Sequence, residues 1–240
     1  MPAISLKRQL LSRSPGGLVH QRSREVIHST GGIMRGKFPS RKTGRLVHYE
    51  GLLERDAIYL FETSPLIESF AEQPERIHFP DGNKLRRYTP DFVLDLHDGR
   101  RVLVEIKPTR SLQRSEVRHK LDCVAAELER MGQAFLVLSE ADLRQQPRLD
   151  NLKWIYQHAA KRVVSFMQSR TAMDSLVGGF PMTLDAASHA LTMHGVEPFG
   201  LLLDGWLQCD LSEPVNFDTP VTLSMESDHE WFHIAPKYGI

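Results

Sequence analysis

Three features are scarce in this sequence: cysteine, long apolar runs and net charge. Because Cys123 and Cys209 are the only cysteines, we expect neither a disulfide framework nor a zinc site built on cysteines. No apolar run approaches the roughly 20 residues of a membrane-spanning helix, so no membrane partner is expected. At 41% hydrophobic residues, the 240-residue chain is too apolar to be disordered. We therefore expect a reduced, globular protein of the cytoplasm, with one large or two small domains.

The net charge of zero conceals an uneven distribution. Residues 1–45 contain ten Lys/Arg and one acidic residue, for +9, whereas residues 46–150 carry −4 and residues 151–240 carry −5. A basic arm ahead of an acidic body favours contact with a polyanion, most simply the DNA of the nucleoid. Two alternatives stay open. The arm is a solvated tail, or it is an organelle-targeting segment, since its first 24 residues are rich in Arg and Ser and lack acids.

The residue pattern divides the chain into this arm and two further units. Glycine-rich turns predict irregular backbone up to about Gly44. Apolar periodicity then predicts a compact α/β unit, with a helix over 49–62, strands over 76–79, 88–96 and 101–107, a helix over 115–131 and a strand over 134–138. Beyond a connector at 145–147, we expect helices over 151–168 and 183–194, and strands or a small wing over 201–211 and 221–223. The predicted domains are 1–45, 46–147 and 148–240.

Two short segments of the α/β unit carry the chemistry: Thr89-Pro90-Asp91-Phe92 and Val104-Glu105-Ile106-Lys107-Pro108. Carboxylate oxygens are the ligands that Mg²⁺ and Mn²⁺ prefer. Such an ion activates a bound water and neutralises charge on a phosphate under attack, and a nearby lysine orients that water. A lone Glu-x-Lys is usually a solvated pair, but here apolar neighbours place it in a buried strand, where charges need partners. The pattern predicts metal-dependent phosphodiester hydrolysis.

The turn between the two strands decides whether the acidic residues meet. If all of His97-Asp98-Gly99 forms the loop, Asp91 pairs opposite Glu105 and the two carboxylates share a face. If only Asp98-Gly99 forms the loop, the pairing slips by one residue and they point apart. Three-residue loops that end in a left-handed glycine are common in hairpins. The sequence permits the metal geometry without compelling it.

Four blocks in order resemble the PD-(D/E)XK nuclease superfamily, and more closely the TnsA-type endonuclease subunit of heteromeric transposases. The blocks are Leu53-Glu54-Arg55-Asp56, Glu72-Gln73-Pro74, Tyr88-Thr89-Pro90-Asp91-Phe92 and Val104-Glu105-Ile106-Lys107-Pro108. The resemblance covers about residues 48–110. It implies an α/β fold with a restriction-endonuclease-like mixed β-sheet core flanked by helices, followed by a small, mostly helical, winged-helix-like C-terminal domain.

The resemblance also implies roles for single residues. Glu54, Asp91 and Glu105 would be the metal ligands, and Lys107 the catalytic lysine. The cofactor would be Mg²⁺, with Mn²⁺ as a substitute. Glu50 stays open as a rival of Glu54, because the two lie four apart on the expected helix. The eleven histidines show no metal-binding spacing, so none is predicted as a ligand.

The function that the resemblance implies is Mg²⁺-dependent cleavage of the 5′ ends of a transposon during cut-and-paste transposition. A TnsB-like transposase would cut and join the 3′ ends, and a TnsC-like AAA+ regulator would contact the C-terminal domain. The negative charge of residues 151–240 favours a protein partner there. Two alternatives stay open: a stand-alone restriction or repair nuclease, and a non-catalytic DNA- or protein-binding scaffold of the same fold.

Overall fold

The structure is a computed structural model that describes residues 34–159, 164–224, 232, 234–235 and 239–240. Most of the expected basic arm, residues 1–33, lies outside the described residues. None of the helices in the described part of the chain combines the length and the apolar character that a membrane crossing requires.

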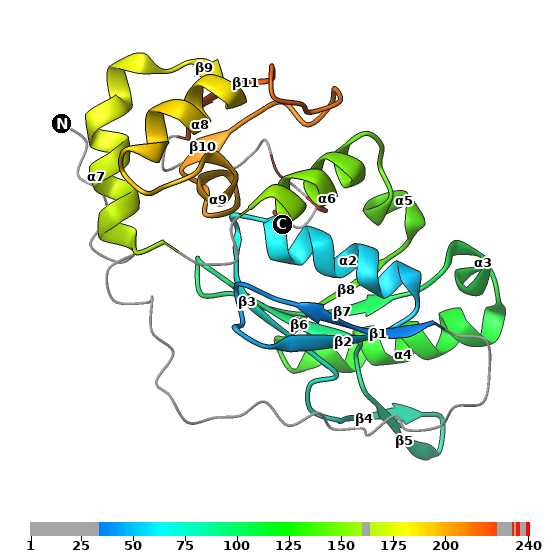
Figure 1. Ribbon diagram of the computed structural model, residues 1–240. Coiled ribbons are helices and arrows are strands. Elements are labelled where there is room, and N and C mark those ends of the chain that lie inside the picture. Colours follow the sequence, from blue (N-terminus) through cyan, green and yellow to red (C-terminus); the bar gives the residue numbers. More distant parts are fainter. Residues whose placement is uncertain (1–33, 160–163, 225–231, 233, 236–238) are drawn as a thin grey trace.

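The first part of the chain mixes strands and helices (Figure 1). Its strands are β1 (Arg35–Pro39), β2 (Leu46–Glu50), β3 (Ile67–Glu72), β4 (Ile77–Asp81), β5 (Lys84–Tyr88), β6 (Phe92–Leu96), β7 (Arg101–Ile106) and β8 (Ala134–Leu138). Its helices are α2 (Leu52–Thr63), α3 (Thr109–Leu112), α4 (Ser115–Arg130), α5 (Glu140–Leu143) and α6 (Arg148–His158).

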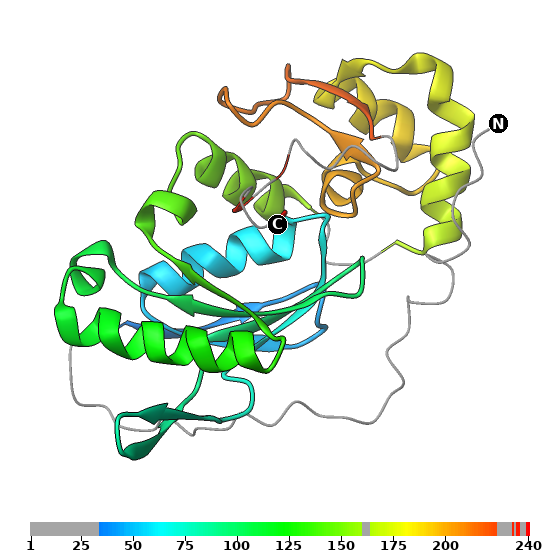
Figure 2. The same cartoon turned by 180° about the vertical axis from the view of Figure 1, so that it is seen from behind.

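A four-stranded mixed sheet in the order β3-β6-β7-β8 forms the centre of this part. β6 pairs antiparallel with β3 and β7, and β8 runs parallel to β7. Because side chains alternate along a strand, Leu94 and Val104 pack in the cluster that contains α2. Val93 and Leu103 belong to a second cluster with Leu121 of α4. Figures 1 and 2 show α2 and α4 on opposite faces, so the expected mixed sheet flanked by helices is confirmed.

The hairpin between β6 and β7 has the longer of the two loops considered above. The N–H of Leu96 donates to the carbonyl of Arg100 at 2.9 Å, so the three residues between them form the loop. Gly99 closes it with φ +87°, a conformation that side chains with a Cβ disfavour. Phe92 consequently lies opposite Val104. Of the two registers left open by the sequence, the structure therefore has the one that brings the two acidic positions onto one face.

The first hairpin, β1–β2, corrects the expectation of irregular backbone up to Gly44. The two strands pair antiparallel, and their turn is fixed on α2 by the buried Glu62. The Ser40 hydroxyl and the Arg41 N–H each donate to this carboxylate at 2.6 Å. Those contacts join residues more than 20 positions apart, which local turn signals do not reveal.

Other element boundaries differ for local reasons. The helix expected from residue 49 begins at Leu52, because residue 50 still belongs to β2 and Gly51, with φ +117°, separates strand from helix. The strand expected over 88–96 is interrupted between Tyr88 and Phe92, where Pro90 lacks the N–H that a ladder needs. Strand β3 was not predicted, although α4 and β8 appear close to their expected positions.

The remaining described elements are α7 (Phe166–Leu176), the 3₁₀ turn η1 (Val177–Gly179), β9 (Met182–Thr183), α8 (Leu184–Thr192), α9 (Pro198–Leu203), β10 (Leu207–Gln208) and β11 (Pro220–Leu223). β11 lies between β10 and β9 in a small sheet. The helix predicted over 151–168 is wrong in extent, because α6 ends at His158. The stretch 201–211 begins in α9 rather than in a strand, since Pro198 opens a helix there.

Helix α6 connects the two parts of the chain. Its Lys153 lies 2.9 Å from the buried Asp56 of α2, and Arg144, just before α6, lies 2.8 Å from the same carboxylate. One buried apolar cluster runs from α2 through α6 to α9. The domain boundaries at residues 45 and 147 stay a prediction.

Candidate functional site

Three of the predicted site residues meet where β6 begins and β7 ends. Continuing the observed register of β6 and β7 places Asp91 opposite Glu105, on the same face of the sheet. Lys107 follows directly on β7, and its Nζ forms an ion pair with Glu105 Oε1 and lies 3.7 Å from Asp91 Oδ2. The N–H of Ile106 donates to the same Asp91 oxygen at 2.8 Å. The Lys107 ammonium group therefore lies between two carboxylates that neighbouring strands hold in place.

The fourth predicted residue, Glu54, reaches this group from the first turn of α2. Its Oε2 accepts a hydrogen bond from the backbone N–H of Glu50 at 2.7 Å. Burial, followed by the negative charge of Asp91, raises the pKa of Glu54 to about 8. The structure thus brings Glu54 into electrostatic contact with the strand residues, although helix and strands are distant in sequence.

The electrostatics show a shortage of positive charge around these acids. Burial and the charge of Glu105 raise the pKa of Asp91 to about 7. Burial alone would lower the pKa of Lys107, but Asp91 and Glu105 outweigh it and raise that pKa. Lys107 is therefore protonated at neutral pH, and its single ammonium group would not balance the three acids in their ionised form. A divalent cation would supply the missing charge.

A buried carboxylate oxygen supports this fit. Glu105 is only 3% exposed. Its Oε2 makes no hydrogen bond of ordinary geometry within the described part of the chain. Tyr88 lies beside it, and burial together with the Glu105 charge raises the pKa of the Tyr88 hydroxyl, so that group keeps its proton. Oxygen ligands of this kind, from Glu54, Asp91 and Glu105, match what Mg²⁺ and Mn²⁺ prefer.

A cavity of about 250 Å³ opens beside the acids. Glu54 and Asp91 line it together with side chains from the unpredicted β1–β2 hairpin and from the end of β3; these are Arg35, Lys37, His48, Tyr49, Glu50, Glu72 and Gln73, with Gly36. Glu105 and Lys107 are not part of the lining. The basic side chains on the β1–β2 wall suit an anionic ligand that approaches the carboxylates.

Glu50 and Glu54 both face the cavity, but they do not share a helix. Glu50 is the last residue of β2, and its Oε1 is buried without a hydrogen bond among the described residues. The interpretation that both project from one helical face is therefore wrong, because Gly51 turns the chain between them. The question of which one binds metal stays open to experiment.

The block Glu72-Gln73-Pro74 has a different part in the site. Glu72 forms a two-pronged ion pair with Arg45, at 3.0 and 2.6 Å, which ties β3 to the β1–β2 hairpin. Gln73 adopts φ +46°, unusual for a residue with a side chain, and its N–H donates to the carbonyl of Asp91 at 2.8 Å. This pair of contacts holds the start of β6. The Glu-Gln-Pro block was visible in the sequence, but its role as a support was not.

A comparison with protein-family models gives an independent result. Residues 64–140 match the model described as TnsA-like endonuclease N terminal. This region includes Asp91, Glu105 and Lys107, and it leaves Glu54 just outside. The match covers about a third of the chain and supports a TnsA-type assignment for this region, and the mixed sheet flanked by helices is consistent with the restriction-endonuclease-like fold. A search of curated proteins gives no match.

Proposed function

We propose that this protein is the Mg²⁺-dependent DNA endonuclease subunit of a heteromeric transposase, cleaving the 5′ ends of a transposon. The observation that carries the proposal is the convergence of one acid from α2 with two acids and one lysine of the region that matches the TnsA-like endonuclease model. The four residues are Glu54, Asp91, Glu105 and Lys107. The proposed role in cut-and-paste transposition rests on the similarity to the TnsA-like family, whereas the hydrolytic chemistry is supported by the residues themselves.

In this proposal Glu54, Asp91 and Glu105 hold the ion. When bound, Mg²⁺ lowers the pKa of a coordinated water and offsets negative charge on the attacked phosphate. Lys107 remains protonated because its pKa is raised, so its Nζ can orient the water and hold a phosphate oxygen. The Ile106 N–H keeps Asp91 Oδ2 in a fixed direction, which limits the reorganisation needed before reaction.

The surroundings of the site support DNA as the substrate. Arg35, Lys37 and His48 line the cavity next to the acids. On the neighbouring β4–β5 hairpin, Lys84 and Arg87 are exposed. Together with the basic residues of the arm, these side chains suit contacts with the phosphate backbone, which bind without reading sequence. Sequence recognition would then belong to the TnsB-like partner.

The C-terminal part, residues 148–240, would bind protein partners, including the TnsC-like AAA+ regulator. Its order of helix α7, strand β9, helices α8 and α9, and strands β10 and β11 supports the winged-helix-like expectation. Residues 151–240 carry ten acidic and five basic residues, which favours a protein over DNA at that end. The ion pairs of Asp56 with Arg144 and Lys153 would transmit partner contacts to α2, the helix that carries Glu54.

The test is a strand-cleavage assay on plasmid that carries the transposon ends, with Mg²⁺ or Mn²⁺, and with or without a TnsB-like transposase and a TnsC-like ATPase. We expect 5′-end cleavage that requires metal and partners and that falls at least about a hundredfold in Asp91→Ala. Glu129→Gln, on the exposed side of α4, is the matched acidic control and should cleave normally.

Three other outcomes would count against the proposal. Cleavage by the isolated chain would favour a stand-alone nuclease. Unchanged cleavage by Asp91→Ala would remove the assigned site. No cleavage in the complete mixture, with DNA binding intact, would favour the non-catalytic scaffold.

A further inference from the structure

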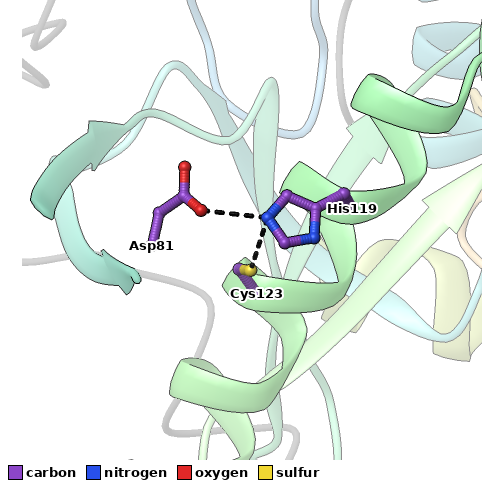
Figure 3. Close-up of side chains that lie close together, drawn as sticks. All are labelled: Asp81, His119 and Cys123. Atoms are coloured by element: carbon purple, nitrogen blue, oxygen red, sulfur yellow. Dashed lines mark hydrogen bonds and ion pairs between the residues drawn. The ribbon is translucent and has the colours of Figure 1, made fainter. Parts of the chain in front are cut away.

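A second group of ligand-type side chains lies between the β4–β5 hairpin and α4, apart from the carboxylate cluster (Figure 3). Asp81 ends β4, and His119 and Cys123 lie four residues apart on α4, so they project from one helix face. His119 Nε2 is 2.9 Å from Asp81 Oδ1 and 3.7 Å from Cys123 Sγ. One ligand atom from each residue lies within 4.8 Å of the others.

These separations match those in a metal site. Zn²⁺ bonds histidine nitrogen and carboxylate oxygen at about 2.1 Å and cysteine sulfur at about 2.3 Å, so tetrahedral ligand atoms lie roughly 3.4–3.6 Å apart. The observed 2.9 and 3.7 Å depart from this range by no more than ~0.5 Å. The three ligand atoms all lie within 4.8 Å of one another, so side-chain rotations that bring Asp81 and Cys123 closer together would complete the geometry.

The ligand types select the ion. Thiolate and imidazole favour Zn²⁺ and similar soft or borderline cations, whereas Mg²⁺ prefers oxygen alone. The Asp81–His119–Cys123 group and the Glu54–Asp91–Glu105 group therefore favour different ions. Mg²⁺, which prefers oxygen ligands, would therefore not compete for the thiolate-containing group.

The carboxylate is already oriented for this role. Arg86 pairs with Asp81 Oδ2, which leaves Oδ1 directed at His119. The His119 side chain is 66% exposed, so an ion can enter from solvent and keep a water as its fourth ligand.

We propose that Asp81, His119 and Cys123 form a binding site for a thiophilic divalent cation of the Zn²⁺ class. The ion links the β4–β5 hairpin to α4. This hairpin is a separate two-stranded sheet, and Figure 1 shows it projecting beyond the central sheet. It attaches to α4 through an apolar cluster that includes Phe79 and Leu121. Because β5 leads through Tyr88 directly to Asp91, the ion stiffens the chain segment that enters the nuclease site.

The sequence did not reveal this group. Its two cysteines exclude only zinc sites with several thiolates, and the search for regular histidine spacing overlooked a ligand set from two elements. The expectation that no histidine binds metal is therefore replaced by a proposal for His119.

The test uses the full chain and Co²⁺, which reports thiolate ligation through a near-ultraviolet charge-transfer band. We expect one equivalent of Co²⁺ to produce this band and Zn²⁺ to displace it. Cys123→Ser and His119→Ala should each abolish the band. Zn²⁺ should also slow amide hydrogen exchange across residues 77–88, and this protection should vanish in Cys123→Ser.

Matched controls separate this site from the others. Cys209→Ser removes the second thiol, which is buried, and should keep the band. His78→Ala removes an exposed histidine from the same hairpin and should also keep it. Asp91→Asn disables the carboxylate cluster and should leave Co²⁺ binding here unchanged. Absence of the band in the parent protein, its persistence in Cys123→Ser, or its loss in Cys209→Ser would each overturn the proposal.

Discussion

The carboxylate of Asp91 accepts a hydrogen bond from the backbone N–H of Ile106 at 2.8 Å. This bond joins the residue that precedes β6 to the strand that carries Glu105, and it fixes the Asp91 side chain before any ligand arrives. Lys107, next along the chain, lies 3.7 Å from the same oxygen. Asp91 Oδ2 is thus held by the Ile106 N–H and lies near the Lys107 ammonium group. These contacts also fix the direction of the second carboxylate oxygen.

Glu54 and Glu50 can be distinguished by single amide substitutions. We expect Glu54→Gln to reduce strand cleavage at least about a hundredfold, because the pKa of Glu54 shows direct coupling to the Asp91 charge. Glu50→Gln should reduce it less than about tenfold. Initial cleavage rates at saturating Mg²⁺ measure both effects. A reversed order would transfer the ligand role to Glu50.

Lys107 should affect chemistry more than metal binding. In Lys107→Met we expect a cleavage rate lower by on the order of 10²–10³, since the variant loses the group that orients water and holds phosphate. Metal affinity, followed by the Mg²⁺-dependent thermal shift, should be equal or higher, because one competing positive charge is gone. Weak metal binding as the main defect would contradict this division of roles.

Stability of the metal-free protein should fall as pH rises. The pKa values of Asp91 and Glu54 are raised to about 7 and about 8, so the folded chain holds these protons more tightly than the unfolded chain does. The contribution of these two groups to the free energy of unfolding is therefore complete below about pH 4 and is lost as the pH rises to about 8. Chemical denaturation at about pH 5 and about pH 8 measures the difference.

The same linkage predicts the effect of substitution and of metal. Glu54→Gln should raise the metal-free stability at pH 8 by about 1–3 kcal/mol relative to the parent, and little at pH 5. Mg²⁺ should stabilise the parent more at the higher pH, since protons and metal compete for the same oxygens. Glu129→Gln serves as the exposed control. If the dependence of stability on pH were the same in Glu54→Gln as in the parent, titration of the buried Glu54 would not be the cause of the stability loss at high pH.

Asp56 should be important for stability although it lies outside the site. Asp56→Ala removes a buried carboxylate that pairs with both Arg144 and Lys153. We expect a loss of about 2–4 kcal/mol in the free energy of unfolding, because two cations lose their common partner. Urea denaturation measures it. A loss below about 0.5 kcal/mol would mean that the two ion pairs contribute no more than surface pairs.

Local signals predicted much of the central fold. The helix over 115–131 and the strand over 134–138 were predictable because their apolar residues recur with clear periods, and Gly132 ends the helix with φ +69°. The hairpin loop before Arg100 was predictable as one of two registers. The β1–β2 hairpin was not, because Glu62 on a distant helix is what fixes its turn.

The sequence by itself determined the chemistry that is available: two acids and a lysine at strand spacing, one further acid on a helix, and the family blocks that surround them. Only the tertiary structure decided the register that sets Asp91 opposite Glu105, and the burial that raises the carboxyl pKa values. It also brought Asp81 of a hairpin to His119 and Cys123 of a helix. The physical reason is that side-chain identity is local, whereas distance, desolvation and charge coupling depend on which segments pack together.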